Sequence, residues 1–207
     1  MPPQGTFERV YGALRQQLRA GVYRPGQRLE PALLADGLHA SVTPVRDALH
    51  RLAGERLVEA PPHEGFRVAP LTESMLRQLY AWHLDLLLLA LSRRPAKAAE
   101  PASAFPQPLL AGEPDALFAQ LAGAAGNAEH LHALRAVRDR LAPFALIERL
   151  MLDTFEADHL AISGAAASGD RRALRAALLQ YHRRRSRIVP ELLAAAQRGG
   201  GPAEPAA

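Results

Sequence analysis

Cysteine is absent from the 207-residue chain, and lysine occurs once, at Lys97. Without thiols the protein has no disulfide, no thiolate metal site and no cysteine nucleophile. The strongest apolar run, Leu84 to Leu91, contains Asp85 and is far shorter than a membrane span. The N-terminus also lacks the basic and then apolar pattern of a secretory signal. We therefore expect a cytoplasmic protein with no membrane partner.

Catalytic signatures are missing as well. The chain contains no G-x-S-x-G elbow, no P-loop and no dinucleotide-binding fingerprint. Its apolar content of 48% and charged content of 22% are those of an ordinary globular protein. The formal net charge of +4 permits an anionic partner without requiring one. We predict that the protein is not an enzyme, and we assign no catalytic residue.

Residues 1–70 predict a small domain of three helices and a β-hairpin. Helical spacing of apolar residues follows Thr6, a candidate N-cap, and a second helix is expected from Pro31. A third helix follows, with Ser41 or Thr43 as its cap and Pro44 in its first turn. Two short strands around a proline- and glycine-containing turn complete the pattern. This order predicts a winged helix-turn-helix, a fold that reads DNA with its third helix.

Residues 71–197 predict an all-α bundle, so that the fold class is mainly α. Long helices are expected over 72–93 and over 128–153, the second of them bent at Pro143. Gly169 should end a further helix, and Asp170 should cap a last one that continues through Leu192. Residues 94–113 are too rich in proline for a continuous helix, and the tail 198–207 should be disordered.

The first domain resembles the N-terminal domain of the GntR family of bacterial transcription regulators. The resemblance covers about sixty residues in order, including "RPGQRL", "TPVRDAL" and the glycine of the wing. In that family the positions of Leu33 and Val42 are commonly arginines that engage DNA. Neither apolar side chain offers a hydrogen-bond donor to guanine or phosphate. Glu64, at the wing tip, places a carboxylate where a basic or small residue is usual.

The resemblance leaves seven candidate DNA-binding residues. Arg46 is the foremost of them, since it matches an arginine that the family retains; the alternative for it is a salt bridge with Asp36 or Asp47. The candidates in the third helix and in the wing are Thr43, Arg46, His50, Arg51, His63, Gly65 and Arg67. The implied partner is double-stranded DNA, read as a palindrome by a homodimer.

The second domain resembles the FCD effector domain of the FadR branch of that family. The motifs that carry the resemblance are "DALFAQLAGAAGN", "DHLAISGAAASGD" and "LQYH". Family members bind a divalent metal in the bundle core through one aspartate and three histidines. Asp115, His159 and His182 match these ligands, whereas Ala119 stands where the second ligand would be. The resemblance therefore implies a three-ligand site for Zn²⁺, Mn²⁺ or Ni²⁺, and the alternative is that the two histidines are ordinary core residues.

Further polar residues of this domain have less defined roles. His83 lies where the family often has an arginine that pairs with an acidic effector, so we assign it to effector binding. The alternatives are that His83 replaces the missing metal ligand or packs beside Trp82. The basic run from Arg183 to Arg187 is interpreted as a solvated face, and His130 and His132 as mostly solvated residues.

Two hypotheses of function follow. The first is a homodimeric transcription regulator that responds to a small-molecule effector, an organic acid. The second is a helical protein descended from such a regulator that now works as a metal-dependent enzyme or a metabolite-binding protein. The unfavourable DNA-contact residues Leu33, Val42 and Glu64, together with a metal set reduced to three ligands, favour the second hypothesis. The ordered N-terminal motifs favour the first.

Overall fold

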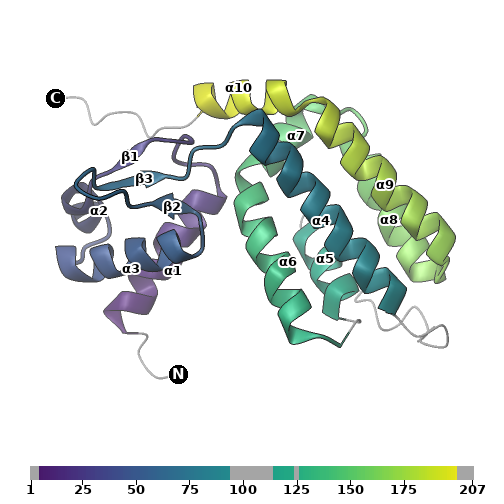
Figure 1. Cartoon of the computed structure of the whole chain (residues 1–207), viewed down its shortest axis with the longest axis horizontal. Helices are drawn as coiled ribbons and strands as arrows, with labels where there is room; N and C mark the ends of the chain where they lie inside the picture. Colours follow the sequence, from purple (N-terminus) through teal and green to yellow (C-terminus); the bar gives the residue numbers. More distant parts are fainter. Residues whose placement is uncertain (1–4, 94–113, 124–125, 200–207) are drawn as a thin grey trace. The chain divides into compact units, whose positions relative to one another are not determined.

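The computed structural model describes residues 5–93, 114–123 and 126–199, which fall into two compact units (Figure 1). Unit 1 takes the chain up to Glu73, then Asp139–Phe144 and the chain from Glu191; unit 2 takes Ser74–Arg138 and Ala145–Pro190. Each unit thus combines segments that are separated in the sequence. The predicted domains 1–70 and 71–197 are continuous in sequence, and they stay predictions. The proline-rich stretch 94–113 and residues 200–207 of the tail lie outside the described residues.

Unit 1 contains the winged helix-turn-helix that the sequence predicts. Its helices and strands are α1 (Thr6–Arg19), β1 (Arg28–Leu29), α2 (Pro31–Gly37), α3 (Val42–Gly54), β2 (Val58–Glu59) and β3 (Phe66–Val68). The helices bury one apolar face each, and the core formed by these faces includes Val10, Leu14, Val45, Leu49, Leu52 and Phe66. Pro31 occupies the first turn of α2, as expected, and Ser41 rather than Thr43 is the N-cap of α3. The predicted cap Thr6 is one residue too late, because Gly5 holds that position.

The sheet of unit 1 has three strands, one more than the predicted hairpin. Their order is β1-β3-β2, and both pairings are antiparallel. The additional strand β1 has only two residues, of which Leu29 is buried opposite Phe66. A two-residue strand is too short to show the alternation by which strands are recognised in a sequence.

The elements that the structure describes after β3 are all helices, in agreement with the predicted fold class. Its elements are α4 (Glu73–Arg93), α5 (Pro114–Gly123), α6 (Ala128–Leu141), the 3₁₀ helix η2 (Ala142–Phe144), α7 (Ala145–Met151), α8 (Phe155–Ser168), α9 (Arg171–Arg187) and α10 (Val189–Gly199). The bend predicted at Pro143 is found as η2, between α6 and α7. No helix among the described residues has both the length and the apolar character that crossing a membrane requires.

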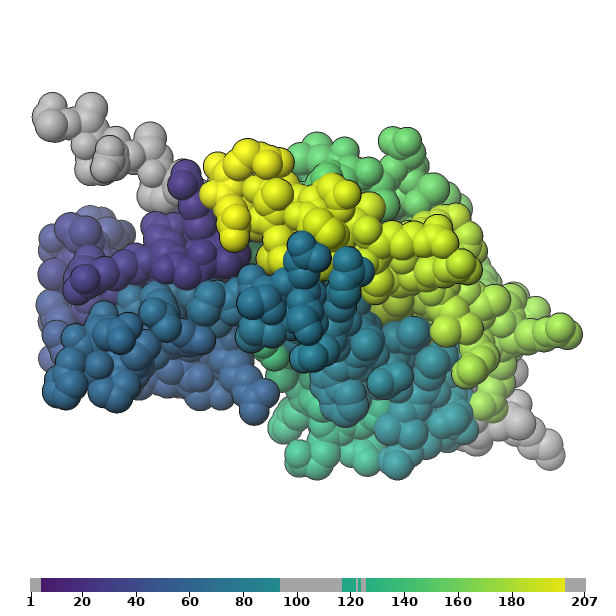
Figure 2. Space-filling view, turned by 45° about the horizontal axis from the view of Figure 1, so that its top comes forward, coloured from purple at the N-terminus to yellow at the C-terminus, as the bar shows by residue number. Residues whose placement is uncertain are grey.

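The predicted last helix is wrong in its length, because it ends at Arg187 and a separate helix, α10, begins at Val189. Pro190 is the physical reason, since a proline has no N–H and its ring clashes with the carbonyl four residues earlier. That carbonyl belongs to Ser186, and it accepts a hydrogen bond from the guanidinium of Arg77 on α4. Figures 1 and 2 both show α4 beside α9, where this bond joins them.

The link between α8 and α9 follows the predicted signals. Gly169 has a φ of 71°, in the left-handed region that ends many helices. The carboxylate of Asp170 then accepts the backbone N–H groups of Arg172 and Ala173, both at 2.9 Å. The two residues together end one helix and begin the next.

We predict that Gly169→Ala destabilises the protein by about 1–2 kcal/mol, because a Cβ makes the left-handed conformation costly. No neighbouring atom lies within 4 Å of the added Cβ, so the backbone alone causes the loss. Gly164→Ala is the matched control, since it lies inside α8 with equal space and an ordinary φ. It should leave the protein equally stable or stabilise it by about 1 kcal/mol. Urea unfolding measures both, and an equal loss in the two variants would contradict the prediction.

Candidate nucleic-acid interface and buried histidine site

The outer face of α3 carries the foremost predicted DNA contacts. Val45 and Leu49 are fully buried on the inner face, so Thr43 and Arg46 are exposed on the other side. In the described part of the chain Arg46 forms no salt bridge with Asp36 or Asp47, the alternative that its sequence position allowed. Its guanidinium is therefore available to an external acceptor.

Arg51, further along α3, is held by unit 1 itself. Its guanidinium lies 4.0 Å from the ring centroid of Tyr11 on α1. It also forms ion pairs with Glu8 at 3.4 Å and with Glu55 at 3.6 Å. A DNA phosphate would have to compete with two carboxylates and a π-face for this side chain.

In the wing, too, the predicted DNA-binding arginine is paired with carboxylates of unit 1. Arg67 on β3 donates to Glu59 at 2.9 Å and to Glu64 at 3.4 Å. His50 packs edge-on against Phe66, with 4.9 Å between ring centroids, and so joins α3 to the wing. His63 and Gly65 form the exposed tip, with φ values of 63° and 79°. The charge that the wing offers to DNA is therefore largely neutralised within the wing.

Two apolar side chains stand at the positions where the resemblance implies arginine. Leu33 on α2 is 70% exposed and Val42 at the start of α3 is 39% exposed. Their exposure shows that the core of unit 1 does not require them to be apolar. The surface formed by α2 and the first turn of α3 therefore has fewer hydrogen-bond donors than the resemblance implies.

In unit 2, the histidines assigned from the resemblance lie in a buried aromatic cluster. His83 Nδ1 on α4 lies 2.9 Å from His182 Nε2 on α9, and His182 Nδ1 bonds the carbonyl of Leu178 at 2.7 Å. Burial lowers the pKa of His182 from 6.5 to about 4, and burial followed by the proximity of His182 lowers the pKa of His83 well below its usual value. Both rings are therefore neutral near pH 7. Since His182 Nδ1–H must donate to a carbonyl, its Nε2 accepts a hydrogen bond from His83 Nδ1–H.

His159 on α8 belongs to the same cluster through Tyr181. The rings of His159 and His182 lie 5.4 Å and 5.0 Å from Tyr181, centroid to centroid. His159 Nδ1 bonds the carbonyl of Phe155 at 2.7 Å, which leaves Nε2 as a lone-pair acceptor. That Nε2 atom is buried and has no hydrogen-bond partner among the described residues.

Unpartnered polar atoms are a general feature of this interior. Within the described residues of unit 2, five buried side-chain atoms lack a hydrogen-bond partner, on five different helices. They are His83 Nε2, Gln120 Oε1, His130 Nε2, His159 Nε2 and Arg185 Nη2. Buried polar groups in folded proteins are nearly always satisfied by protein, water or ligand. The cluster therefore has unused capacity to bind something polar.

The metal set implied by the resemblance is only partly supported by this geometry. His159 Nε2 has the free lone pair that a ligand needs, but His182 Nε2 is engaged by His83. Asp115 lies on α5, and its side chain is outside the part that the structure describes. Among the described side chains no three histidine or carboxylate groups converge as a metal site would require.

Arg185 was missed by the sequence interpretation, which placed it on a solvated basic face. It is fully buried and bonds Glu148 at 2.7 Å and Asp158 at 2.9 Å, while its guanidinium stacks 3.3 Å from the Tyr181 ring centroid. Helical spacing could have revealed it, because Arg185 falls four residues after Tyr181 and seven after Leu178, on the buried face of α9. His130, expected to be solvated, is likewise buried, while His132 is exposed.

Comparison with known proteins supports the interpretation of the N-terminal unit. Residues 6–68 match the model of one protein family, the bacterial regulatory proteins of the gntR family. The matched residues contain the whole winged helix, from α1 to β3. An alignment over 83 residues is 34% identical to the HTH-type transcriptional regulator McbR of Escherichia coli and covers 40% of this chain. Another over 88 residues is 27% identical to the HTH-type regulator YdhC of Bacillus subtilis and covers 42%. The chain thus spans under two fifths of the length of these relatives, at 38% and 39%.

Two solved structures resemble nearly the whole chain. A crystal structure described as a transcriptional regulator GntR from Rhodococcus sp. RHA1 superposes with a TM-score of 0.72, covering 91% of this chain and 99% of that one. E. coli McbR/YncC superposes with a TM-score of 0.66, covering 91% and 98%. At 18% and 17% sequence identity these similarities establish the fold alone: a winged helix followed by a helical C-terminal part.

We predict that Arg185→Met lowers the free energy of unfolding by about 3–5 kcal/mol, because Glu148 would lose its buried counter-ion and Asp158 would keep only the partly exposed Arg184. Arg183→Met is the matched control on the same helix, since Arg183 is exposed. It should change stability by no more than about 0.5 kcal/mol. Equal urea midpoints for the two variants would show that the buried ion pairs contribute nothing.

Proposed function

We propose that the protein is a DNA-binding transcription regulator. The gntR-type winged helix with an exposed, unpaired Arg46 on α3 is the observation that carries this proposal. Thr43 and Arg46 project from the first half of α3, the part that meets base edges in helix-turn-helix proteins. Arg51 and Arg67 would contribute less than Arg46, because both already have carboxylate partners.

Binding as a homodimer to a palindromic operator is part of the proposal. On α4 the large exposed side chains Met75, Trp82 and Leu89 recur every seven residues, so they share one helix face. This pattern is symmetric about Trp82. If two copies paired through antiparallel α4 helices, Met75 of one copy would meet Leu89 of the other, as a two-fold interface requires.

The proposed regulator also binds a small-molecule effector in unit 2. Five unpartnered buried polar atoms support a polar ligand there, and His83 Nε2 is one of them. An organic acid could accept a hydrogen bond from the free Nη2 of Arg185. To act on transcription, the ligand must bind the DNA-competent and DNA-incompetent states with different affinities.

We predict that Arg46→Ala weakens binding to the operator by about 1–3 kcal/mol, because it removes the principal charged contact of α3. Val42→Arg should strengthen binding to DNA in general, since it adds a donor and a charge beside the phosphates. Fluorescence anisotropy at low salt, with duplexes from the region upstream of the gene, measures both affinities.

The control is Arg172→Ala on α9, whose side chain is exposed in unit 2. It should bind DNA with unchanged affinity. If Arg46→Ala and Val42→Arg also leave the affinity unchanged, α3 is not the element that enters the groove. If no duplex is bound in a salt-sensitive way, the regulator proposal itself fails.

A divalent metal held by Asp115, His159 and His182 remains a separate proposal. The free lone pair of His159 Nε2 supports it, and the His83–His182 hydrogen bond would have to be given up. We predict that protein purified without chelator contains Zn²⁺, Mn²⁺ or Ni²⁺, and that His159→Ala lowers this content severalfold while His132→Ala does not. Elemental analysis measures it. A metal content near zero, with no rise in melting temperature on adding any of the three ions, would leave the cluster to organic ligands.

The second candidate function is a helical metabolite-binding protein or enzyme with weakened DNA binding. The exposed apolar Leu33 and Val42 and the neutralised Arg67 are the observations that favour it. The same anisotropy survey separates the two candidates, because only the regulator must bind a specific duplex more tightly than a scrambled one.

A further inference from the structure

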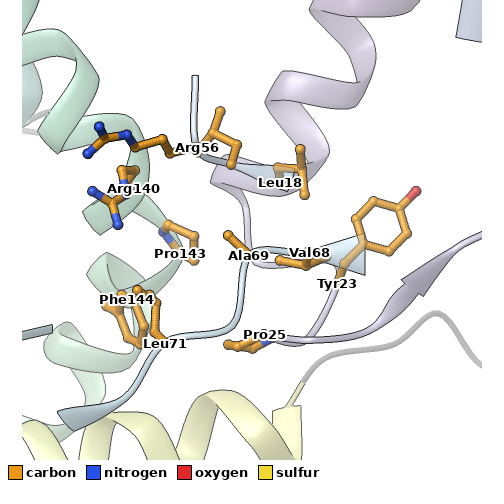
Figure 3. A pocket seen from close by; sticks show the side chains of 11 residues that line it. Leu18, Tyr23, Pro25, Arg56, Val68, Ala69, Leu71, Arg140, Pro143 and Phe144 are labelled. Atoms are coloured by element: carbon orange, nitrogen blue, oxygen red, sulfur yellow. The ribbon is translucent and has the colours of Figure 1, made fainter. Parts of the chain in front are cut away.

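Unit 1 contains a small cavity with an unusual pair of arginines at its rim. The cavity has a volume of about 40 Å³ and is lined on its apolar side by residues that include Leu57, Val68 and Phe144. Arg56 and Arg140 complete the lining, and Figure 3 shows their side chains on the same side of the cavity. This volume admits one small chemical group, whereas pockets for larger organic ligands have several hundred cubic ångströms.

Neither arginine has a counter-ion among the residues that the structure describes. The acid next to Arg140 in sequence, Asp139, is already bound by Arg15 at 2.5 Å and by Arg19. The carboxylate of Asp139 is thus already engaged by two other guanidinium groups. The pKa of Arg140 is lowered by burial and, further, by Arg56, which places the two positive charges within each other's field.

The backbone at Arg56 is strained in a way that favours glycine. Arg56 has a φ of 61° directly after α3, and its N–H bonds the carbonyl of Ala53 at 3.0 Å. The N–H of Leu57 bonds the carbonyl of Leu52, also at 3.0 Å. These two bonds define a helix ending whose left-handed residue is usually glycine. An arginine at this position carries a backbone cost, while it brings a guanidinium to the cavity.

We propose that Arg56 and Arg140 form a binding site for a small free oxyanion, either inorganic phosphate or a short carboxylate. Two neighbouring guanidinium groups match the charge of such an anion, and the cavity beside them has room for one compact group. The anion would supply the negative charge that the two side chains lack. This site is separate from the histidine cluster of unit 2.

An anion here would act on the elements that carry the wing and α3. Arg56 directly follows α3, and Leu57 and Val68 flank or belong to the strands of the wing. A bound anion would therefore stiffen the end of α3 against the segment around Arg140. An effect of the bound anion on DNA affinity would require the proposed function to be right. Binding of the anion itself does not depend on the proposed function.

The test is isothermal titration calorimetry of the full-length protein with sodium phosphate and, separately, with sodium acetate, at constant ionic strength set with chloride. We expect saturable binding at one site, with the tighter of the two salts identifying the kind of anion. Arg56→Gly should weaken this binding at least tenfold without lowering the melting temperature, because glycine suits the left-handed backbone. Arg140→Gln should weaken it similarly, and Arg172→Gln on α9 should not change it.

Several outcomes would overturn the inference. The first is that neither phosphate nor acetate binds to the protein. The second is that all variants bind the anion with equal affinity. The third is that no free anion binds, while Arg56→Gly loses affinity for DNA. The last result would assign the arginines to the DNA backbone instead. If the anion binds as expected but no duplex is bound by any form of the protein, the site stands and the proposed regulator function fails.

Discussion

The interior of unit 2 depends on one buried guanidinium. Arg185 bonds Glu148 on α7 and Asp158 on α8, and it stacks on Tyr181 of its own helix. Glu148 in turn accepts a hydrogen bond from Tyr80 on α4 at 2.5 Å. These buried, hydrogen-bonded groups therefore join four helices. Removing one charged partner would leave another charge buried without a counter-ion, which is strongly destabilising. The histidine cluster lies against this network, so its geometry is fixed by the same contacts.

Unit 1 contains two kinds of arginine, and the difference between them locates its chemistry. In the wing and at the end of α3, Arg67 and Arg51 are matched by nearby carboxylates. Arg46, Arg56 and Arg140, by contrast, have no carboxylate partner among the residues that the structure describes. The phosphate backbone of DNA suits Arg46, which lies on an exposed helix face. A single compact anion suits Arg56 and Arg140, which border a small cavity.

Local rules predicted most of the fold, and long-range contacts decided what they missed. Gly169 and Asp170 were identifiable because turn and cap chemistry lies within a few residues of sequence. The strand β1 was not, because two residues form a strand only when Phe66 is already in position. Arg185 was misplaced because the charge of its neighbours masked its helical spacing. The histidine cluster was anticipated through resemblance, but the His83–His182 bond needs two helices 99 residues apart in sequence to meet.

Trp82 gives the protein a built-in reporter. It is the single tryptophan of the chain, and half of its surface is exposed in the middle of the outer face of α4. The tryptophan fluorescence of this protein therefore originates at one known place, and an indole emits at shorter wavelength when water is removed from it. Whatever covers that face of α4 will shift the emission, and events that leave the face open to solvent will not. A change in shape can thus be followed in the unlabelled protein, without adding a dye or a cysteine.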